Sequence, residues 1–239
     1  MISGYWVVVP AAGAGRRMGA DQPKQYLPLL GRPILSLTLR NILTWPGLAG
    51  VVVAISADDR DFEHLPEARD SRVHPVQGGA ERADSVLAAL NFLAPKVSPA
   101  TQVLVHDAAR PCVAVEDIEA LLAAESASAL LARPASDTVK LGQKSAAGIS
   151  SIEKTLDRSR IWLAQTPQRA PLSRLHSALR EALERGDPVT DEASALEFAG
   201  DHPQLVLGRS DNLKLTHPED IPLAEAVLRL RFAAVEGNR

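Results

Sequence analysis

A chain of 239 residues, of which 46% are apolar and 23% charged, is long enough for one large α/β domain and too apolar to be disordered throughout. Its net charge of −3 argues against a nucleic-acid binder with a broad basic face, and a single cysteine, Cys112, excludes an internal disulfide framework. The opening MISGYWVVVP lacks a basic region, and its apolar run is too short for a signal or membrane segment. We therefore expect a cytoplasmic protein with no membrane partner.

Short runs rich in β-branched residues alternate with helical patterns along the chain, which is typical of βαβ units and a mainly parallel sheet. Strands are predicted at residues 5–9, 51–55, 103–106, 130–133 and 205–207. Helices are predicted from Pro33 to the break at Pro46-Gly47, from Leu172 to a stop at Gly186, at 189–198 with Thr190 as the cap, and at 218–231. The pattern indicates one Rossmann-like α/β domain over residues 1–239, with a twisted, mostly parallel sheet flanked by helices.

The segment from Asp137 to Asp157 is polar and poor in large apolar residues. Its two halves, residues 138–141 and 149–155, alternate in polarity around Gly142 and Gly148. This pattern favours a projecting β-hairpin arm over residues 137–157, with a disordered loop as the alternative. Because an isolated polar hairpin is marginally stable in water, we expect the arm to pack on a second subunit of a homodimer.

A glycine-rich loop, residues 10–19, follows the first predicted strand, and open α/β sheets bind ligands at this kind of position. Small residues allow backbone N–H groups to approach phosphate oxygens, and nearby cations neutralise those oxygens. The planar guanidinium of Arg17 and the compact ammonium of Lys24 lie within this one connection and suit a triphosphate. A tight turn from strand to helix is the alternative interpretation.

Two common nucleotide motifs do not match this loop. The dinucleotide fingerprint needs a glycine where Met18 stands, and it needs an acidic residue about 20 positions further on. No Asp or Glu occurs between Asp21 and Asp58. A P-loop would need Gly-Lys-Ser/Thr at its end, which is absent here. The loop therefore indicates neither NAD binding nor a Walker-type NTPase.

The string PAAGAGRRM at residues 10–18, followed by PKQY at 23–26, resembles the opening of nucleotidyltransferases that activate sugar phosphates. It closely resembles the 2-C-methyl-D-erythritol 4-phosphate cytidylyltransferase family. Further strings that match this family are GGAERADS at 78–85, VLVHDAARP at 103–111, Asp137-Thr138, Asp157-Arg158, QTPQ at 165–168, VTDEAS at 189–194 and DNLKLT at 211–216. Because they follow in order across residues 5–230, the resemblance covers nearly the whole chain.

The resemblance implies transfer of CMP from CTP to methylerythritol phosphate, with release of pyrophosphate, in the non-mevalonate route to isoprenoid precursors. It implies a Mg²⁺ ion on Asp107 and cationic catalytic residues at Arg17, Lys24 and Lys214. The nucleotide contacts that it implies are Pro10, Ala11, Ala12, Gly13, Ala14, Gly15, Gly79, Ala80, Ser85 and Ala108. The acceptor contacts that it implies are Arg110, Thr138, Thr166, Thr190, and Arg158 of a partner subunit.

Each of these residues also has a simpler interpretation. Asp107 could be a helix cap or a structural partner of Arg110, and Lys214 could be a surface lysine. The GGAERADS segment could be an ordinary helix start with Arg82 and Asp84 in solvent. His106 is expected to be structural.

The proposed chemistry is in-line attack of the acceptor phosphate on the α-phosphorus of CTP. Because a phosphate monoester is already ionised near pH 7, no general base is needed, and catalysis reduces to positioning and charge stabilisation.

The sequence is also compatible with two other functions. Ribitol 5-phosphate cytidylyltransferases resemble the chain in the loop and nucleotide segments, but they carry a larger residue where this chain has Ala109. A non-catalytic nucleotide-binding scaffold is the second alternative. It is disfavoured because a degenerate relative is expected to lose some of the charged residues Arg17, Lys24, Asp107 and Lys214, and all four are present.

Overall fold

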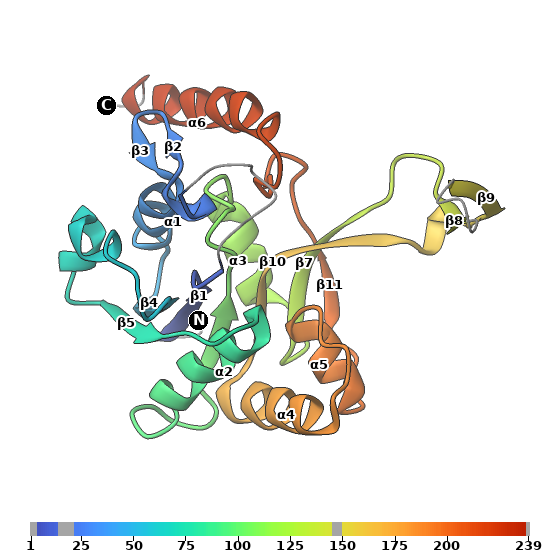
Figure 1. The fold of residues 1–239 in the computed structure, drawn as a ribbon, viewed down its shortest axis with the longest axis horizontal. Helices are drawn as coiled ribbons and strands as arrows, with labels where there is room; N and C mark the ends of the chain where they lie inside the picture. Colours follow the sequence, from blue (N-terminus) through green and yellow to red (C-terminus); the bar gives the residue numbers. More distant parts are fainter. Residues whose placement is uncertain (1–3, 14–21, 145–149, 238–239) are drawn as a thin grey trace.

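A central sheet of seven strands forms the body of the molecule in the computed structural model, which describes residues 4–13, 22–144 and 150–237 (Figure 1). Its strand order is β11-β7-β10-β6-β1-β4-β5. The strands are β1 (Tyr5–Pro10), β4 (Leu48–Ile55), β5 (Val73–Gln77), β6 (Gln102–Val105), β7 (Ala129–Pro134), β10 (Trp162–Pro171) and β11 (Gln204–Leu207). All neighbours are parallel except that β10 runs antiparallel to both β6 and β7. The predicted single α/β domain with a mostly parallel sheet is therefore confirmed.

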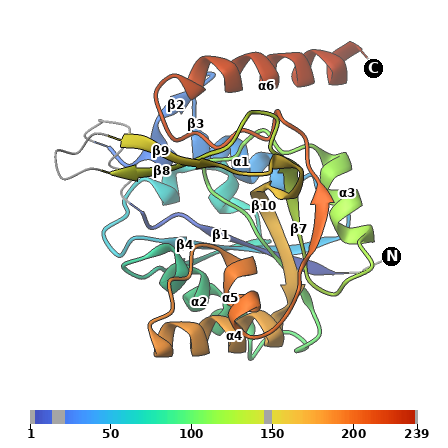
Figure 2. The same ribbon diagram turned by 90° about the vertical axis from the view of Figure 1, so that its right-hand side faces the viewer.

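Helices cover both faces of this sheet (Figure 2). On one face, Val7 and Val9 of β1 share a buried cluster with α1 (Ile34–Ile42) and α3 (Val115–Ala123). On the other face, Val8 packs with α2 (Arg82–Leu93), α4 (Leu172–Arg185) and α5 (Glu192–Phe198). Successive side chains of a strand point to opposite faces, so a strand covered on both sides reads as a continuous apolar run. Burying each such side chain contributes about 1.5–3 kcal/mol.

A further layer joins the two ends of the chain. The C-terminal helix α6 (Asp220–Gly237) lies over the small hairpin of β2 (Pro28–Leu29) and β3 (Arg32–Pro33), as Figures 1 and 2 show. Leu29 of the hairpin is fully buried in a cluster with Leu215 and with Ala224 and Leu228 of α6. The short 3₁₀ helices are Lys24–Tyr26, Phe62–His64, Pro66–Arg69 and Arg158–Arg160. In the described residues, no helix combines the length and apolar character needed to cross a membrane.

The predicted arm is present as a two-stranded antiparallel hairpin of β8 (Lys140–Lys144) and β9 (Ser150–Thr155). It projects away from the body of the molecule (Figure 1). The side chains of β9 are all exposed, including Ile152 at 63%. The predicted hairpin is confirmed, although Gly148 lies outside the described residues. Its packing on a second subunit remains a prediction.

Strand β10 is the main element that the sequence patterns do not reveal. It carries Pro167 near its centre, and a proline inside a run argues against a central strand. The ladder between β10 and β7 is irregular between Ala164 and Gln168, which accommodates the proline. The buried guanidinium of Arg169 donates to the carbonyls of Leu122, Ala124 and Ser126 and ties β10 to the chain after α3. The polar side chain of Arg169 is thus buried because it forms hydrogen bonds with the backbone of a neighbouring segment.

The predicted cap of helix α5 is wrong by one residue. Asp191, not Thr190, precedes the helix, and its side chain accepts a hydrogen bond of 2.9 Å from the backbone N–H of Ser194. The hydroxyl of Ser194 in turn accepts from the backbone N–H of Asp191, which completes a capping box. Thr190 lies outside the helix with its side chain exposed. Asp191 also accepts a hydrogen bond from Gln168.

We expect Asp191→Ala to lower the free energy of unfolding by about 1–2 kcal/mol, because it removes the N-cap. Thr190→Ala should change it by less than about 0.5 kcal/mol, as surface substitutions generally do. Urea unfolding followed by circular dichroism measures both values. Equal destabilisation by the two variants would contradict the assignment of the cap to Asp191.

Candidate active site

A cavity of about 550 Å³ opens at the carboxyl ends of β1, β5 and β6. From β1 the chain proceeds to β4 and β5 on one side and then returns to β6 on the other side of β1. A reversal of this kind leaves a crevice beyond the strand ends, where α/β proteins bind ligands. The cavity is lined by Pro10, Ala11, Ala12, Gly13, Lys24, Gln25, Gly79, Ala80, Glu81, Arg82, Ser85, Asp107, Ala108, Ala109 and Lys214.

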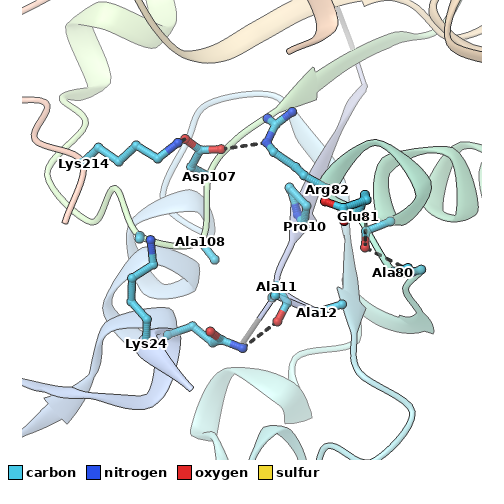
Figure 3. A pocket seen from close by; sticks show the side chains of 15 residues that line it. Pro10, Ala11, Ala12, Lys24, Ala80, Glu81, Arg82, Asp107, Ala108 and Lys214 are labelled. Carbon is cyan, nitrogen blue, oxygen red and sulfur yellow. Dashed lines mark hydrogen bonds and ion pairs between the residues drawn. The ribbon is translucent and has the colours of Figure 1, made fainter. Parts of the chain in front are cut away.

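The first wall of the cavity is the start of the loop after β1. The backbone N–H of Ala11 donates to the carbonyl of Ala54 at 2.7 Å, which extends the pairing of β1 and β4 into the loop. The carbonyl of Ala11 accepts from Nε2 of Gln25 at 2.6 Å. Tyr26 is anchored on the other side by a hydrogen bond of 2.7 Å to Asp59. These contacts fix the 3₁₀ turn that carries Lys24 into the cavity (Figure 3).

The second wall is the turn between β5 and α2. A Cβ atom on Gly78 would lie 2.6 Å from Cβ of Ala12 and 2.8 Å from Oγ of Ser85, so only glycine fits there. The hydroxyl of Ser85 accepts from the N–H of Gly79 and donates to the carbonyl of Glu81, both at 3.1 Å. Ser85 therefore stabilises this turn, and it lines the cavity together with Gly79 and Ala80.

Asp107, two residues after the end of β6, is the centre of charge in the cavity. Arg82 and Lys214 approach its carboxylate from opposite sides (Figure 3). Nε of Arg82 lies 3.2 Å from Oδ1, and Nζ of Lys214 lies 2.9 Å from Oδ2. Nε of Arg110 lies 3.5 Å from Oδ2. Burial by itself raises the pKa of this carboxyl, but the positive charges of Arg82, Lys214 and Arg110 outweigh it and hold the pKa well below its usual range.

A buried polar layer lies behind Asp107 and fixes its backbone. Oγ1 of Thr166 accepts from the N–H of Asp107 at 3.0 Å and contacts Nδ1 of His106 at 3.1 Å. Burial lowers the pKa of His106 to about 4, so this imidazole is neutral at pH 7, as its expected structural role requires. Nη1 of Arg110 donates to the carbonyl of Asn212 at 2.7 Å. The layer thus connects the end of β6 with the loop that carries Lys214.

Most of the residues predicted for the nucleotide and the reaction meet in this cavity. Those that line it are Pro10, Ala11, Ala12, Gly13, Lys24, Gly79, Ala80, Ser85, Asp107, Ala108 and Lys214. Arg17, Ala14 and Gly15 lie outside the described residues. Lys214 is not an isolated surface lysine, and Asp107 pairs with more partners than Arg110.

The five residues predicted for the acceptor do not line the cavity. Arg110 and Thr166 are buried behind Asp107, and Thr190 is exposed before α5. Thr138 and Arg158 are exposed where the arm leaves the body. There, Arg158 donates a hydrogen bond to the carbonyl of Ser136. In the described residues of one chain, the residues predicted to bind the nucleotide thus lie together in the cavity, whereas those predicted to bind the acceptor lie at separate places outside it.

Two charged residues of the site were not predicted. Arg82 is not in solvent, since it lines the cavity and pairs with both Asp107 and Glu192. Glu192 is buried at 3% exposure, although a first-turn acidic residue is usually read as a partner of the helix dipole. Their position inside GGAERADS and VTDEAS, two strings that resemble the family, is the feature of the sequence that could have indicated a role in the site.

Comparison with known proteins gives a consistent result. The family model described as "IspD: 2-C-methyl-D-erythritol 4-phosphate cytidylyltransferase" matches residues 5–230. The protein of that name from Shewanella amazonensis is 52% identical over 225 residues, covering 93% of this chain and 92% of the relative. The one from Ectopseudomonas mendocina is 50% identical over 243 residues, covering 100% and 99%.

Solved structures agree with the sequence relatives. The crystal structure of 2-C-methyl-D-erythritol 4-phosphate cytidylyltransferase from Francisella tularensis superposes with a TM-score of 0.80 at 35% identity, covering 94% of this chain and all of that one. The enzyme from Thermus thermophilus gives a TM-score of 0.76 at 30% identity, covering 95% and 99%. On these matches, the chain belongs to the 2-C-methyl-D-erythritol 4-phosphate cytidylyltransferase family.

Proposed function

We propose that this chain transfers CMP from CTP to 2-C-methyl-D-erythritol 4-phosphate and releases pyrophosphate, in the non-mevalonate route to isoprenoid precursors. The proposal is supported by one cavity, which is lined by the turn at Gly79 and Ala80, by Lys24 and Lys214, and by the buried Asp107. The chain that forms this cavity belongs to the family named above. A volume of about 550 Å³ lies within the range of small-molecule sites. We also propose a cytoplasmic location.

The reaction joins two anions, so charge is its main obstacle. A phosphate oxygen of the acceptor attacks the α-phosphorus of CTP, and the bond from that phosphorus to the pyrophosphate oxygen breaks. The acceptor phosphate needs no base to ionise it near pH 7. Lys24 and Lys214 line the cavity and would stabilise the charge on the reacting phosphates. Arg17, which lies outside the described residues, is proposed to act with these two lysines.

The nucleotide is expected to lie along the backbone walls. The small residues Ala11, Ala12 and Gly13 allow phosphates to approach backbone N–H groups at the end of β1. The turn containing Gly79 and Ala80, together with Ala108, presents peptide groups to the base and ribose. Because Ala80 has no polar side chain, any contact from this position is made by the backbone.

Asp107 fits a role in holding Mg²⁺. In the described residues, no group of three or more His, Cys, Asp or Glu side chains could form a complete protein metal site. Mg²⁺ characteristically binds to one or two carboxylates and completes its coordination with substrate phosphates and water. Asp107 supplies one ionised carboxylate beside the expected phosphate positions. When bound there, the metal ion would neutralise phosphate charge.

The acceptor set would be completed by a second copy of the chain. Thr138 and Arg158 both lie near the base of the arm, where Arg158 donates a hydrogen bond to the carbonyl of Ser136. Four exposed apolar side chains mark the same region: Leu141 and Ile152 on the arm and Trp162 and Leu163 at its base, at 37, 63, 37 and 43% exposure. Burial of these side chains in a symmetric dimer would stabilise the hairpin and bring Arg158 to the partner's cavity.

Ribitol 5-phosphate is the disfavoured alternative acceptor. The relatives reported above are named for methylerythritol phosphate, and the small residue Ala109 lines the cavity.

Purified protein with Mg²⁺, CTP and methylerythritol phosphate should release pyrophosphate, and chelation of the metal should stop the release. A coupled pyrophosphate assay with each of the four NTPs and with both acceptors measures the preference. A higher kcat/KM with ribitol 5-phosphate would overturn the assignment of the acceptor.

Lys24→Ala should lower kcat about 10²- to 10³-fold with the fold intact, because the lost charge acts mainly on the transition state. Arg17→Ala should behave alike. Lys96→Ala is the matched control, since Lys96 contacts the ring of Phe92 away from the cavity, and it should leave kcat unchanged. Steady-state kinetics and circular dichroism test this expectation. An increase in KM alone for Lys24→Ala would show that the ammonium serves only ground-state binding.

Arg158→Ala should weaken binding of methylerythritol phosphate and spare binding of CTP, as measured by calorimetry. Mixing it with the Lys24→Ala variant tests the shared site more sharply. In a mixed dimer with a shared site, one cavity carries both defects and the other carries neither, so activity returns after subunit exchange. If Arg158 serves its own chain, each cavity keeps one defect and mixing restores nothing.

A further inference from the structure

The ammonium of Lys214 is carried by a loop that has no regular structure of its own. This loop, called here the Lys214 loop, comprises residues 208–219 between β11 and α6, and that range contains neither helix nor strand. Nζ of Lys214 nevertheless lies 2.9 Å from Oδ2 of Asp107 in the cavity. A loop without a backbone ladder is held in place by individual contacts with its neighbours. The contacts of the Lys214 loop therefore determine where the ammonium lies.

The Lys214 loop is joined to the segment that follows β6, residues 106–114. The backbone N–H of Leu215 donates to the carbonyl of Ala109 at 2.9 Å. The guanidinium of Arg110 donates to the carbonyl of Asn212 at 2.7 Å. One of these contacts precedes the lysine and the other follows it, so both fix the backbone that carries its side chain.

Arg231 of α6 makes a further connection between the same two segments. Its Nη2 atom lies 3.0 Å from Oδ2 of Asp211, in the Lys214 loop. Its Nη1 atom donates to the carbonyl of Cys112, in the segment after β6. Asp211 also pairs with Arg209, but that ion pair lies within the loop and does not attach it to another element. One guanidinium from the last helix thus bridges the loop and the segment.

Arg231 reaches this place because it continues the buried stripe of α6. Ala224 and Leu228 pack in the apolar cluster that also contains Leu215, and Arg231 follows them at spacings of seven and three residues. Side chains at these spacings lie on one face of a helix. The neighbouring Leu230 is 74% exposed, whereas the side chain of Arg231 is 26% exposed. The stem of the arginine therefore lies against the fold, and its charged end meets Asp211.

The bridge holds a charged group. Hydrogen bonds from Arg209 and then from Arg231 keep the pKa of the Asp211 carboxyl below its ordinary value, although partial burial opposes them. The carboxylate is therefore ionised at pH 7 and attracts the guanidinium. Because both side chains are about three-quarters buried, solvent screens this pair less than it screens a pair on the open surface.

We propose that Arg231 is a positioning residue: by bridging Asp211 and the carbonyl of Cys112, it fixes the Lys214 loop and holds the ammonium of Lys214 at the reacting phosphates. This inference deepens the proposed function and rests on it. Arg231 is not among the described residues that line the cavity, so it acts through Lys214. It also lies directly after residues 5–230, which the family model matches.

Arg231→Met removes the charge and the donors and keeps an unbranched side chain. It should lower kcat about 10- to 100-fold and change the KM for CTP much less, because a shift of about 1 Å in a group that acts on the transition state can cost that much. Arg229→Met is the matched control, since Arg229 pairs with Glu225 on the exposed side of the same helix, and it should leave kcat unchanged. Steady-state kinetics measure both variants. An unchanged kcat for Arg231→Met, or an equal loss for Arg229→Met, would overturn the proposal.

A double variant separates positioning from general structural damage. Lys214→Ala alone should lower kcat about 10²- to 10³-fold. If Arg231 acts through Lys214, adding Arg231→Met to Lys214→Ala should lower kcat by no more than about twofold further, because the group being positioned is already gone. Losses that multiply would show that Arg231 acts by another route, and the proposal would be wrong.

Hydrogen–deuterium exchange of the protein without nucleotide gives a readout that does not depend on the reaction. Peptides from the Lys214 loop should exchange faster in Arg231→Met than in the unchanged protein or in Arg229→Met, whereas peptides from β1 and β4 should not change. Unchanged exchange in the loop contradicts the bridge, and faster exchange throughout the chain contradicts a local positioning role. The proposed function fails separately if the unchanged protein releases no pyrophosphate from CTP and methylerythritol phosphate, a result that leaves the exchange readout intact.

Discussion

The arrangement of this active site depends on one buried carboxylate, that of Asp107. A charge out of water is strongly unfavourable unless oppositely charged groups surround it, and removing one such partner destabilises the site. Its partners come from the start of α2, from the end of β6 and from the loop before α6. These segments must meet for the carboxylate to be buried and ionised. The requirement that Asp107 be neutralised therefore specifies how the turn after β5 and the loop with Lys214 are placed.

The cavity differs in charge from the molecule as a whole. The chain carries a net charge of −3, but the described part of the cavity wall includes the cations Lys24, Arg82 and Lys214 and two carboxylates, those of Glu81 and Asp107. A local excess of positive charge inside a low-dielectric cleft attracts a small anion, whereas the net negative charge of the whole chain does not favour a long polyanion.

The sequence was informative where chemistry is local. The glycine-rich loop, Lys24 and Asp107 could be predicted because each lies in a short string whose residue types suit phosphate or a hard cation, whereas Lys214 was predicted from the family resemblance alone. The pairing of Arg82 with Glu192 could not be predicted, because the two residues are 110 positions apart and nothing in either string indicates a contact with the other. Strand β10 was hidden by Pro167 and by polar residues that are buried for their hydrogen bonds. The cap of α5 was misplaced because Thr190 and Asp191 are both good capping residues, and only the backbone decides between them.

The closing of the fold by its C-terminal helix has a consequence for biosynthesis. A ribosome delivers the chain from the N-terminus, so the glycine-rich loop and the β2–β3 hairpin emerge long before the residues that complete them. Leu29 can be buried against α6 only after that helix has been synthesised. Asp107 can form its ion pair with Lys214 only shortly before that point. The nascent chain consequently has no finished catalytic centre at any intermediate length. The hairpin near the N-terminus and the carboxylate after β6 therefore reach their observed contacts only after the last helix and the loop before it have been made.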